Sequence, residues 1–283
     1  MYPYRVYDVF TDTPFGGNQL AVFPDATDIA EENLHKITRE FNFSEVTFVY
    51  PPKDPANTAK VRIFTPTIEV PFAGHPTIGT AIALADLGHT GPMTLELGVG
   101  PIACVVEGKT ASFTTSAALE IIATPTPALV AAALGISADA IDTRAHVPTQ
   151  ATLGLAFICV ALKTRADLAA CRPVIDAFRT GAKAYPADLD FAIFAYVQTG
   201  DHIDARMFAP LDNMLEDPAT GSASATLTAL LSQIAGKPMT FDIHQGDDMG
   251  RPSRIKARAL PGDPMPIEIT GNAVMTMEGR FLL

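Results

Sequence analysis

Short runs of β-branched and aromatic residues, separated by Gly, Pro and Asp, dominate the chain and are typical of strands. The first set comprises "YRVYDVFT", "LAVFP", "EVTFVYP", "KVRIFTP" and "TLELGVGPIACVVEG". A second set follows residue 150 and comprises "GLAFICVAL", "DFAIFAYVQ", "HIDARMFAP" and "IKARAL". The closing segment, "PIEITGNAVMTMEGRFLL", is expected to form a hairpin. Two sets of strands predict two sheets.

Two segments depart from this pattern, because they are small or apolar around most of a helix circumference. They are "TIGTAIALADL", which follows Pro76, and "ATGSASATLTALLSQIA", which follows Pro218. Proline suits the first helical position, where it has no N–H to lose, and Gly88 and Gly236 are the expected C-caps. A helix that is apolar on all sides is buried. The sequence therefore predicts an α+β fold in which a curled, barrel-like mixed sheet surrounds a central helix, and predicts it twice.

A repeated motif supports this duplication. "RIFTPTIEVPFAGHPTIGTA" and "RMFAPLDNMLEDPATGSASA" share Arg, Phe and Pro positions and the small residues that follow the last proline. Between the two copies, "ASFTTSAALEIIATPTP" has the composition of a linker. A chain of 283 residues is long enough for two domains. We therefore expect domains at 1–120 and 121–283, with the option that the last strand returns to the first domain.

Composition narrows the possible partners. The formal net charge of -11 argues against binding to nucleic acid or to an anionic membrane, since both need a basic surface. The N-terminal stretch lacks the pattern of a signal peptide, and no apolar stretch reaches membrane-spanning length. A soluble cytoplasmic protein with a small-molecule partner is the resulting expectation.

Neither the cysteines nor the histidines show the spacing of a metal site. Three cysteines form no disulfide framework and no zinc pattern. Five histidines stand apart from one another, without the i, i+3 or i, i+4 spacing of helical ligands. They are His35, His89, His146, His202 and His244. No metal and no cofactor are expected.

The starts of the two central helices are candidate chemical sites, since His75 and Asp217 both precede a proline where an N-cap is predicted. Aspartate is a preferred N-cap, so capping and chemistry are both open for Asp217, whereas histidine is a poor cap and chemistry is favoured for His75. First-turn amides carry the positive end of the helix dipole and bind carboxylates readily. The small residues there would let a ligand approach these amides, although close helix packing explains them as well. The residues at issue are Gly74, Thr77, Gly221 and Ser222.

Glu45 is the third candidate. In "FNFSEVTFVY" the alternation places Glu45 on one strand face with Phe43, Thr47 and Val49. Partial burial there would raise the pKa of the carboxyl, which suits a group that takes and returns a proton. A glutamate at the wet end of a strand is the alternative.

Together these segments resemble the PhzF-like phenazine biosynthesis family, within the diaminopimelate epimerase-like superfamily. The resemblance extends over the whole chain and rests on "DVFTDTPFGGNQLAVF", "FNFSEVTFV", "PFAGHPTIGTA", "EDPATGSA" and "HQGDDMGRPSRI". It implies two similar domains with the active site in the cleft between them, and a homodimer. It also implies that Glu45 is the acid/base group and that His75, Asp217 and Ser222 surround the substrate, with Asn18 of the first motif among the binding residues.

The chemistry implied is cofactor-independent isomerisation, in which Glu45 moves a proton within a small unsaturated carboxylic acid. In the epimerase relatives each helix start carries a cysteine, whereas here His75 and Asp217 occupy these positions. Two alternatives stay open: an epimerase or racemase of a small amino or hydroxy acid, and a non-catalytic protein that binds a small anionic metabolite. The sequence does not specify the substrate.

Overall fold

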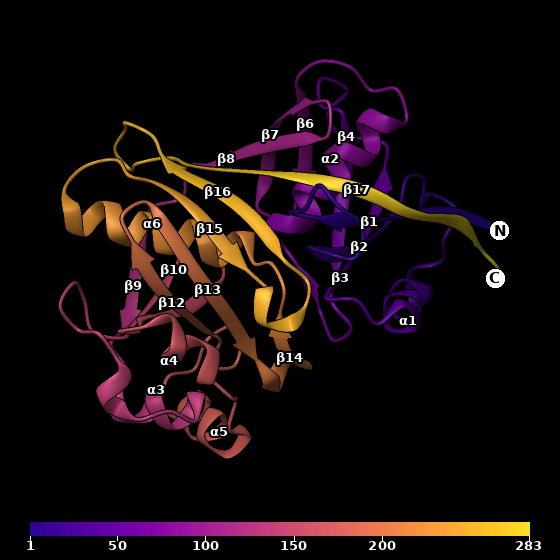
Figure 1. Cartoon of the computed structure of the whole chain (residues 1–283). Coiled ribbons are helices and arrows are strands. Elements are labelled where there is room, and N and C mark those ends of the chain that lie inside the picture. The colour runs from indigo at the N-terminus through magenta and orange to yellow at the C-terminus, as the bar shows by residue number, and fades with distance from the viewer. The chain divides into compact units, whose positions relative to one another are not determined.

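The computed structural model describes residues 1–283, which divide into two compact units. One unit consists of residues 1–115 together with 268–283, and the other of residues 116–267. The sequence predicts a boundary near residue 120 and a second domain of 121–283, with the option that the last strand returns to the first domain. Residues 268–281 belong to strand β17 (Ile267–Phe281), which pairs antiparallel with β1 (Tyr2–Val9). In Figure 1 the yellow C-terminal strand accordingly runs beside the indigo N-terminal one.

The closing segment is therefore one strand of 15 residues, and the predicted hairpin is wrong. Gly271, a residue type that often marks a turn, serves packing here. A Cβ at this position would lie 2.1 Å from Cδ1 of Phe10, so only glycine allows the aromatic ring to approach the strand. The neighbouring Asn272 accepts hydrogen bonds from the Thr110 hydroxyl and the Phe10 backbone N–H, both at 2.7 Å. These contacts hold β17 extended.

The first unit is a closed barrel of eight strands. Its sheet begins with β1 and continues through β2 (Asn18–Phe23), β3 (Glu45–Tyr50), β4 (Ala59–Phe64), β6 (Met93–Leu97), β7 (Gly100–Glu107) and β8 (Thr110–Thr115). Strand β17 pairs with both β1 and β8 and thereby closes the ring. The short β5 (Glu69–Val70) pairs antiparallel with the last two residues of β4.

Helix α2 (Gly74–Asp86) fills this barrel. It contacts strands β1, β2, β3, β6, β7 and β8, and every residue from Gly74 to Leu84 is buried. Gly79 fits closely here, because a Cβ would lie 2.6 Å from Leu20 and 2.7 Å from Val9. Helix α1 (Glu31–Phe41) packs against β3 and β4, where its apolar face joins an aromatic cluster that includes Phe23 and Phe48.

The second unit repeats these pairings. Its strands are β9 (Glu120–Ala123), β10 (Thr149–Thr152), β11 (Ala156–Ala161), β12 (Ile193–Thr199), β13 (His202–Ala209), β14 (Met214–Asp217), β15 (Thr240–Gln245) and β16 (Ser253–Ala259). From β1 to β7, successive strand pairs are antiparallel, parallel, antiparallel, parallel and antiparallel. The second parallel pair consists of β4 and β6, which precede and follow the central helix in the chain. From β10 to β16 the strand pairs follow the same order. The duplication predicted from one motif thus extends to the whole topology.

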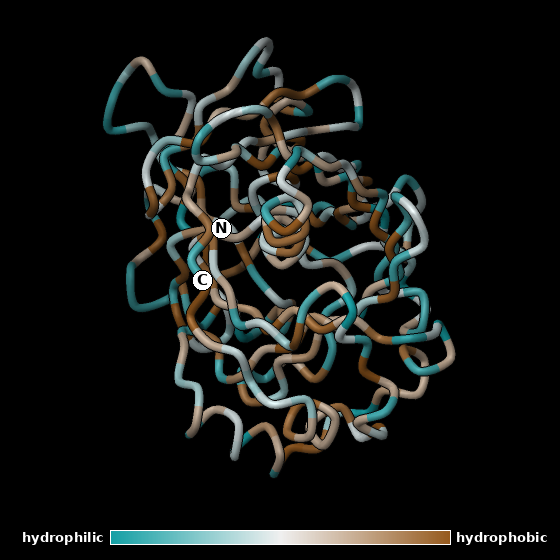
Figure 2. Tube along the Cα trace, turned by 90° about the vertical axis from the view of Figure 1, so that its left-hand side faces the viewer, coloured by the Kyte–Doolittle hydropathy of each residue, from teal (hydrophilic) through white to brown (hydrophobic).

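Helix α6 (Gly221–Ala235) is the central helix of the second unit, and it ends at Gly236 in the left-handed conformation, as predicted. It contacts β10, β11, β15 and β16. The opposite faces of β11 and β12 pack with α3 (Pro127–Leu134), α4 (Arg165–Ala170) and α5 (Ile175–Ala184) in a separate apolar cluster. Figure 2, which looks roughly along α6, shows brown residues along strands and helices and teal residues concentrated in the outer loops.

None of the helices combines the length and the apolar character that crossing a bilayer requires.

Candidate active site

The two central helices begin at different points from those predicted. Helix α2 begins at Gly74 after the N-cap Ala73, so His75 lies inside the first turn and is not the cap. Helix α6 begins at Gly221 after the N-cap Thr220, and Asp217 is the last residue of β14. Pro76 therefore takes the third helical position. That position tolerates proline because the first four N–H groups of a helix have no partner within it.

Glu45 is the first residue of β3, and its side chain is 13% exposed. Alternation places Glu45 on the same face as Thr47, whose hydroxyl accepts a hydrogen bond from Thr80 of α2 at 2.9 Å. This face therefore looks into the barrel. The Glu45 Oε2 atom lies 3.5 Å from Nδ1 of His75.

His75 is buried, with 4% of its side chain exposed. Burial lowers the pKa of its imidazole to about 3, and a backbone hydrogen bond with Gln19 opposes the shift only in part. The ring is therefore neutral near pH 7, so its contact with Glu45 is a polar contact and not an ion pair. The Nε2 atom of the ring is buried and has no hydrogen-bond partner. A buried polar atom without a partner is costly, and at a helix start it is a position for a ligand group.

This burial makes the stability of the protein depend on pH. Because the folded-state pKa of His75 lies below its unfolded value of about 6.5, the unfolded chain binds the proton first as the pH falls. The stabilisation from His75 is present above pH 6.5 and is lost toward pH 3. Between pH 7 and 5, we expect the wild type to lose about 2 kcal/mol more unfolding free energy than His75→Gln does. Urea unfolding at both pH values measures this, and equal losses would contradict a neutral buried ring.

Asn18 contacts both the residue before β3 and the first turn of α2. It is the first residue of β2 and is buried, and its Nδ2 atom lies 3.4 Å from Nδ1 of His75. The Ser44 hydroxyl donates to Asn18 Oδ1 at 3.4 Å. The structure thus brings Asn18, Ser44, Glu45 and His75 together. The sequence analysis did not single out Ser44, although it directly precedes Glu45.

Thr77 is placed differently from the expectation of a substrate-binding residue. Its hydroxyl donates to the Ala73 carbonyl at 2.7 Å, and its backbone N–H reaches the same oxygen at 3.3 Å. The side chain is fully buried. Neither the hydroxyl nor the backbone N–H of Thr77 is therefore a free donor at the start of α2.

In the second unit, a buried hydrogen-bond network holds Asp217, whose exposure is 4%. The Thr220 hydroxyl donates to Asp217 Oδ2 at 2.5 Å. The Gln245 side-chain amide donates to the Asp217 carbonyl at 2.8 Å and to Thr220 Oγ1 at 2.9 Å, and its Oε1 accepts from the Thr220 N–H at 3.1 Å. Gln245 therefore fixes the turn between β14 and α6.

Sequence reasoning missed Gln245, although a signal existed. In β15 the residues Phe241, Ile243 and Gln245 share the buried face, so the alternation itself marks a buried polar residue at the strand end. A buried amide needs partners, and the turn before α6 supplies them here.

Gly221 and Ser222 are the first two residues of α6. Gly221 is buried and Ser222 is partly exposed. By contrast, Ser224 is fully buried and donates to the Thr220 carbonyl at 2.9 Å. Ser222 is thus the first-turn hydroxyl that a ligand can reach.

The arginines of the repeated motif are structural in both copies. The Arg62 guanidinium lies 4.9 Å from the Phe64 ring centroid and forms hydrogen bonds with Glu31 and Glu69. Arg206 stacks on Phe208 at the same distance and binds Glu216 through two bonds of 2.7 Å. Each arginine therefore forms its ion pairs with carboxylates of its own unit.

We expect Arg206→Met to lower the unfolding free energy by about 3 kcal/mol, because the change leaves Glu216 and three carbonyls of the α4 turn without their buried partner. Arg62→Met is the matched control. Its partner Glu31 is 73% exposed, so a loss below about 1 kcal/mol is expected. Urea unfolding of both variants measures the difference, and equal losses would contradict the contrast.

The three cysteines are buried thiols. Burial raises the pKa of Cys104 and Cys159 to about 12 and that of Cys171 to about 11. Proton transfer by cysteine requires thiolates near neutral pH, which burial opposes.

Two histidines that the sequence analysis described as standing apart are neighbours. The ring centroids of His202 and His244 lie 4.4 Å apart, because β13 and β15 pair in parallel. Spacing rules for helical ligands do not detect a contact that strand pairing creates.

Comparison with known proteins agrees with the fold. Residues 7–279 match the family model described as phenazine biosynthesis-like protein. The trans-2,3-dihydro-3-hydroxyanthranilate isomerase of Pseudomonas aeruginosa is 34% identical over 291 residues, which cover 100% of both chains. Among solved structures, a predicted epimerase from Pseudomonas aeruginosa is 29% identical, with a TM-score of 0.83 and 100% of both chains covered. A PhzF-family phenazine biosynthesis protein from Bacillus anthracis shares the fold at a TM-score of 0.88 and 22% identity, covering 100% of this chain and 99% of its own.

The fold and these relatives define an isomerase with an epimerase-like architecture. The chain belongs to the PhzF family of phenazine biosynthesis-like proteins.

Proposed function

We propose that this isomerase moves a proton within a small unsaturated carboxylic acid without a cofactor, and that Glu45 is the acid/base group. The observation that carries the proposal is the largely buried Glu45 carboxyl, 3.5 Å from the neutral ring of His75. A neutral imidazole places no positive charge beside Glu45. A carboxyl that exchanges between both forms suits general acid/base catalysis.

In the proposed reaction the Glu45 carboxylate takes a proton from one carbon of the substrate while the double bond shifts. The resulting carboxylic acid then returns the proton to another carbon of the same molecule. The reaction balances without an oxidant, a reductant or a net change in protons. We assign the binding of a hydroxyl or amino group of the substrate to Nε2 of His75, which is buried and has no hydrogen-bond partner.

Asp217 is proposed as the second polar contact. Because Thr220 and Gln245 fix its carboxylate and its backbone, Asp217 holds one orientation without rearranging when substrate binds. The amides of Gly221 and Ser222, together with the Ser222 hydroxyl, are proposed to bind the substrate carboxylate. Both arginines of the repeat are occupied, which favours recognition of the anion by backbone groups.

The proposal includes a cleft between the two units, as the family resemblance implies, so that residues of both units act on one substrate. It also includes a homodimer, on the same ground. The name of the 34% identical relative supplies the substrate to try first, an unsaturated cyclic acid that carries amino and hydroxyl groups.

Incubation in deuterated water with trans-2,3-dihydro-3-hydroxyanthranilate tests the proposal, followed by a library of unsaturated acids. Mass spectrometry and proton NMR should show deuterium on carbon and a shifted double bond. Deuterium with inverted configuration and no bond shift would indicate an epimerase instead. A ligand that binds without any exchange would indicate a non-catalytic binding protein. In every case Glu45→Gln is the matched control.

A further inference from the structure

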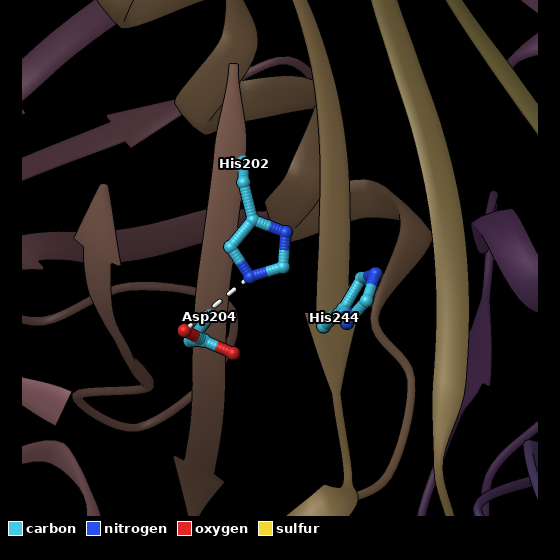
Figure 3. A group of neighbouring side chains, drawn as sticks. All are labelled: His202, Asp204 and His244. Atoms are coloured by element: carbon cyan, nitrogen blue, oxygen red, sulfur yellow. Dashed lines mark ion pairs between the residues drawn. The ribbon is translucent and has the colours of Figure 1, made fainter. Parts of the chain in front are cut away.

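A group of potential metal ligands lies on the outer face of the second unit, away from α6. His202 and Asp204 are two residues apart on β13 and share a face, and Asp204 pairs in register with His244 of β15. Figure 3 shows the three side chains gathered over these two strands, with the ion pair between His202 and Asp204 marked. One ligand atom from each residue lies within 4.8 Å of the others.

The distances are compatible with one ion. Two ligand atoms about 2.0 Å from a tetrahedral zinc are separated by roughly 3.3 Å. His202 Nε2 and Asp204 Oδ2 are 3.4 Å apart, so this pair needs almost no adjustment. The two imidazoles meet edge to face, with an interplanar angle of 80°. A rotation of the His244 side chain is the remaining adjustment.

The electrostatics also suit a metal. The basic neighbours have carboxylate partners of their own. Arg254 pairs with Asp247 at 2.9 Å, and Arg165 lies 2.8 Å from Asp248 but 3.8 Å from Asp204. The carboxylate of Asp204 therefore faces the histidines.

We propose that His202, Asp204 and His244 bind a divalent transition metal ion, for which zinc is the best match. Two imidazoles and one carboxylate suit zinc and its neighbours in the transition series, whereas calcium and magnesium require oxygen ligands. His202 is 40% exposed and Asp204 is 28% exposed, so water completes the coordination. The buried cysteines cannot provide a competing site.

The ion would connect β13 to β15. These strands flank the crossover through α6, and the residue after His244 is Gln245, whose side chain points to the opposite face and holds the turn at Asp217. A metal on the outer face would therefore restrain the strand end that positions Gln245. This inference does not depend on the proposed isomerase reaction.

Isothermal titration calorimetry with zinc chloride tests the site, on untagged full-length protein that has first been stripped with a chelator. We expect one zinc ion per chain, and affinities at least about tenfold weaker in His202→Ala, Asp204→Asn and His244→Ala. His89→Ala, which removes an exposed histidine of the other unit, is the matched control and should bind like the wild type. Arg165→Gln should bind more tightly, since it removes the cation nearest Asp204.

Thermal unfolding gives a second measurement. Zinc should raise the Tm of the wild type and of His89→Ala, and leave that of His244→Ala unchanged, because binding to the native state stabilises it. Absence of saturable binding to the wild type would overturn the proposal. So would equal affinities in the wild type and the three ligand variants.

Discussion

Replacing Glu45 by glutamine is expected to lower kcat by roughly a hundred- to ten-thousand-fold, the contribution of one general acid/base group. The amide has nearly the shape of the carboxyl but cannot accept the proton. Because Glu45 begins its strand and is partly exposed, the fold should survive the change. Steady-state kinetics on the substrate found by deuterium exchange measures the effect.

Glu69→Gln is the matched control for this experiment. Glu69 belongs to the same unit but binds Arg62 at the surface, so its variant should keep kcat within about twofold, as is usual for an exposed ion pair. Circular dichroism and Tm should confirm that both variants are folded. If folded Glu45→Gln turns over like the wild type, the proton carrier is another residue.

Replacing Gly221 by valine is expected to weaken substrate binding by more than a hundredfold. Gly221 is buried at the start of α6, so a branched side chain would occupy the space that a bound carboxylate needs beside the first-turn amides. Ser222→Ala removes one hydroxyl and leaves the amides, so a loss of about fivefold is expected, equivalent to about 1 kcal/mol. Titration of the substrate, or of its inactive analogue, measures both.

The informative result is which variant, Gly221→Val or Ser222→Ala, loses more substrate affinity. Gly221→Ala supplies an intermediate side chain and guards against a valine variant that does not fold. If Ser222→Ala proves far more damaging than Gly221→Val, then side chains and not backbone amides recognise the anion.

The duplication was predictable because its signal is local. Each copy of the motif contains a strand residue pattern, a proline and an apolar helix, and together these determine where the central helix must lie. The strand face of Glu45 followed from alternation alone. The precise helix starts did not follow, because proline is tolerated at any of the first helical positions and Pro76 occupies the third.

The partners that strand pairing brings into contact were beyond the sequence. The histidine pair on β13 and β15 depends on a parallel register, and the buried network at Asp217 depends on Gln245 arriving from the next strand. The closing segment was predicted to be a hairpin, whereas it forms one strand in which Gly271 allows the ring of Phe10 to approach closely. Each is a non-local contact, which local periodicity does not encode.

The closure of the first barrel by β17 has a consequence for the order of folding during synthesis. Residues 116–267 emerge from the ribosome as a contiguous unit and can fold while translation continues. The unit that carries Glu45 and His75 has an open edge on both β1 and β8 until residues 268–283 have been made. The unit synthesised first is therefore completed last, and during that interval its exposed strand edges are the part of the nascent protein most in need of protection from aggregation.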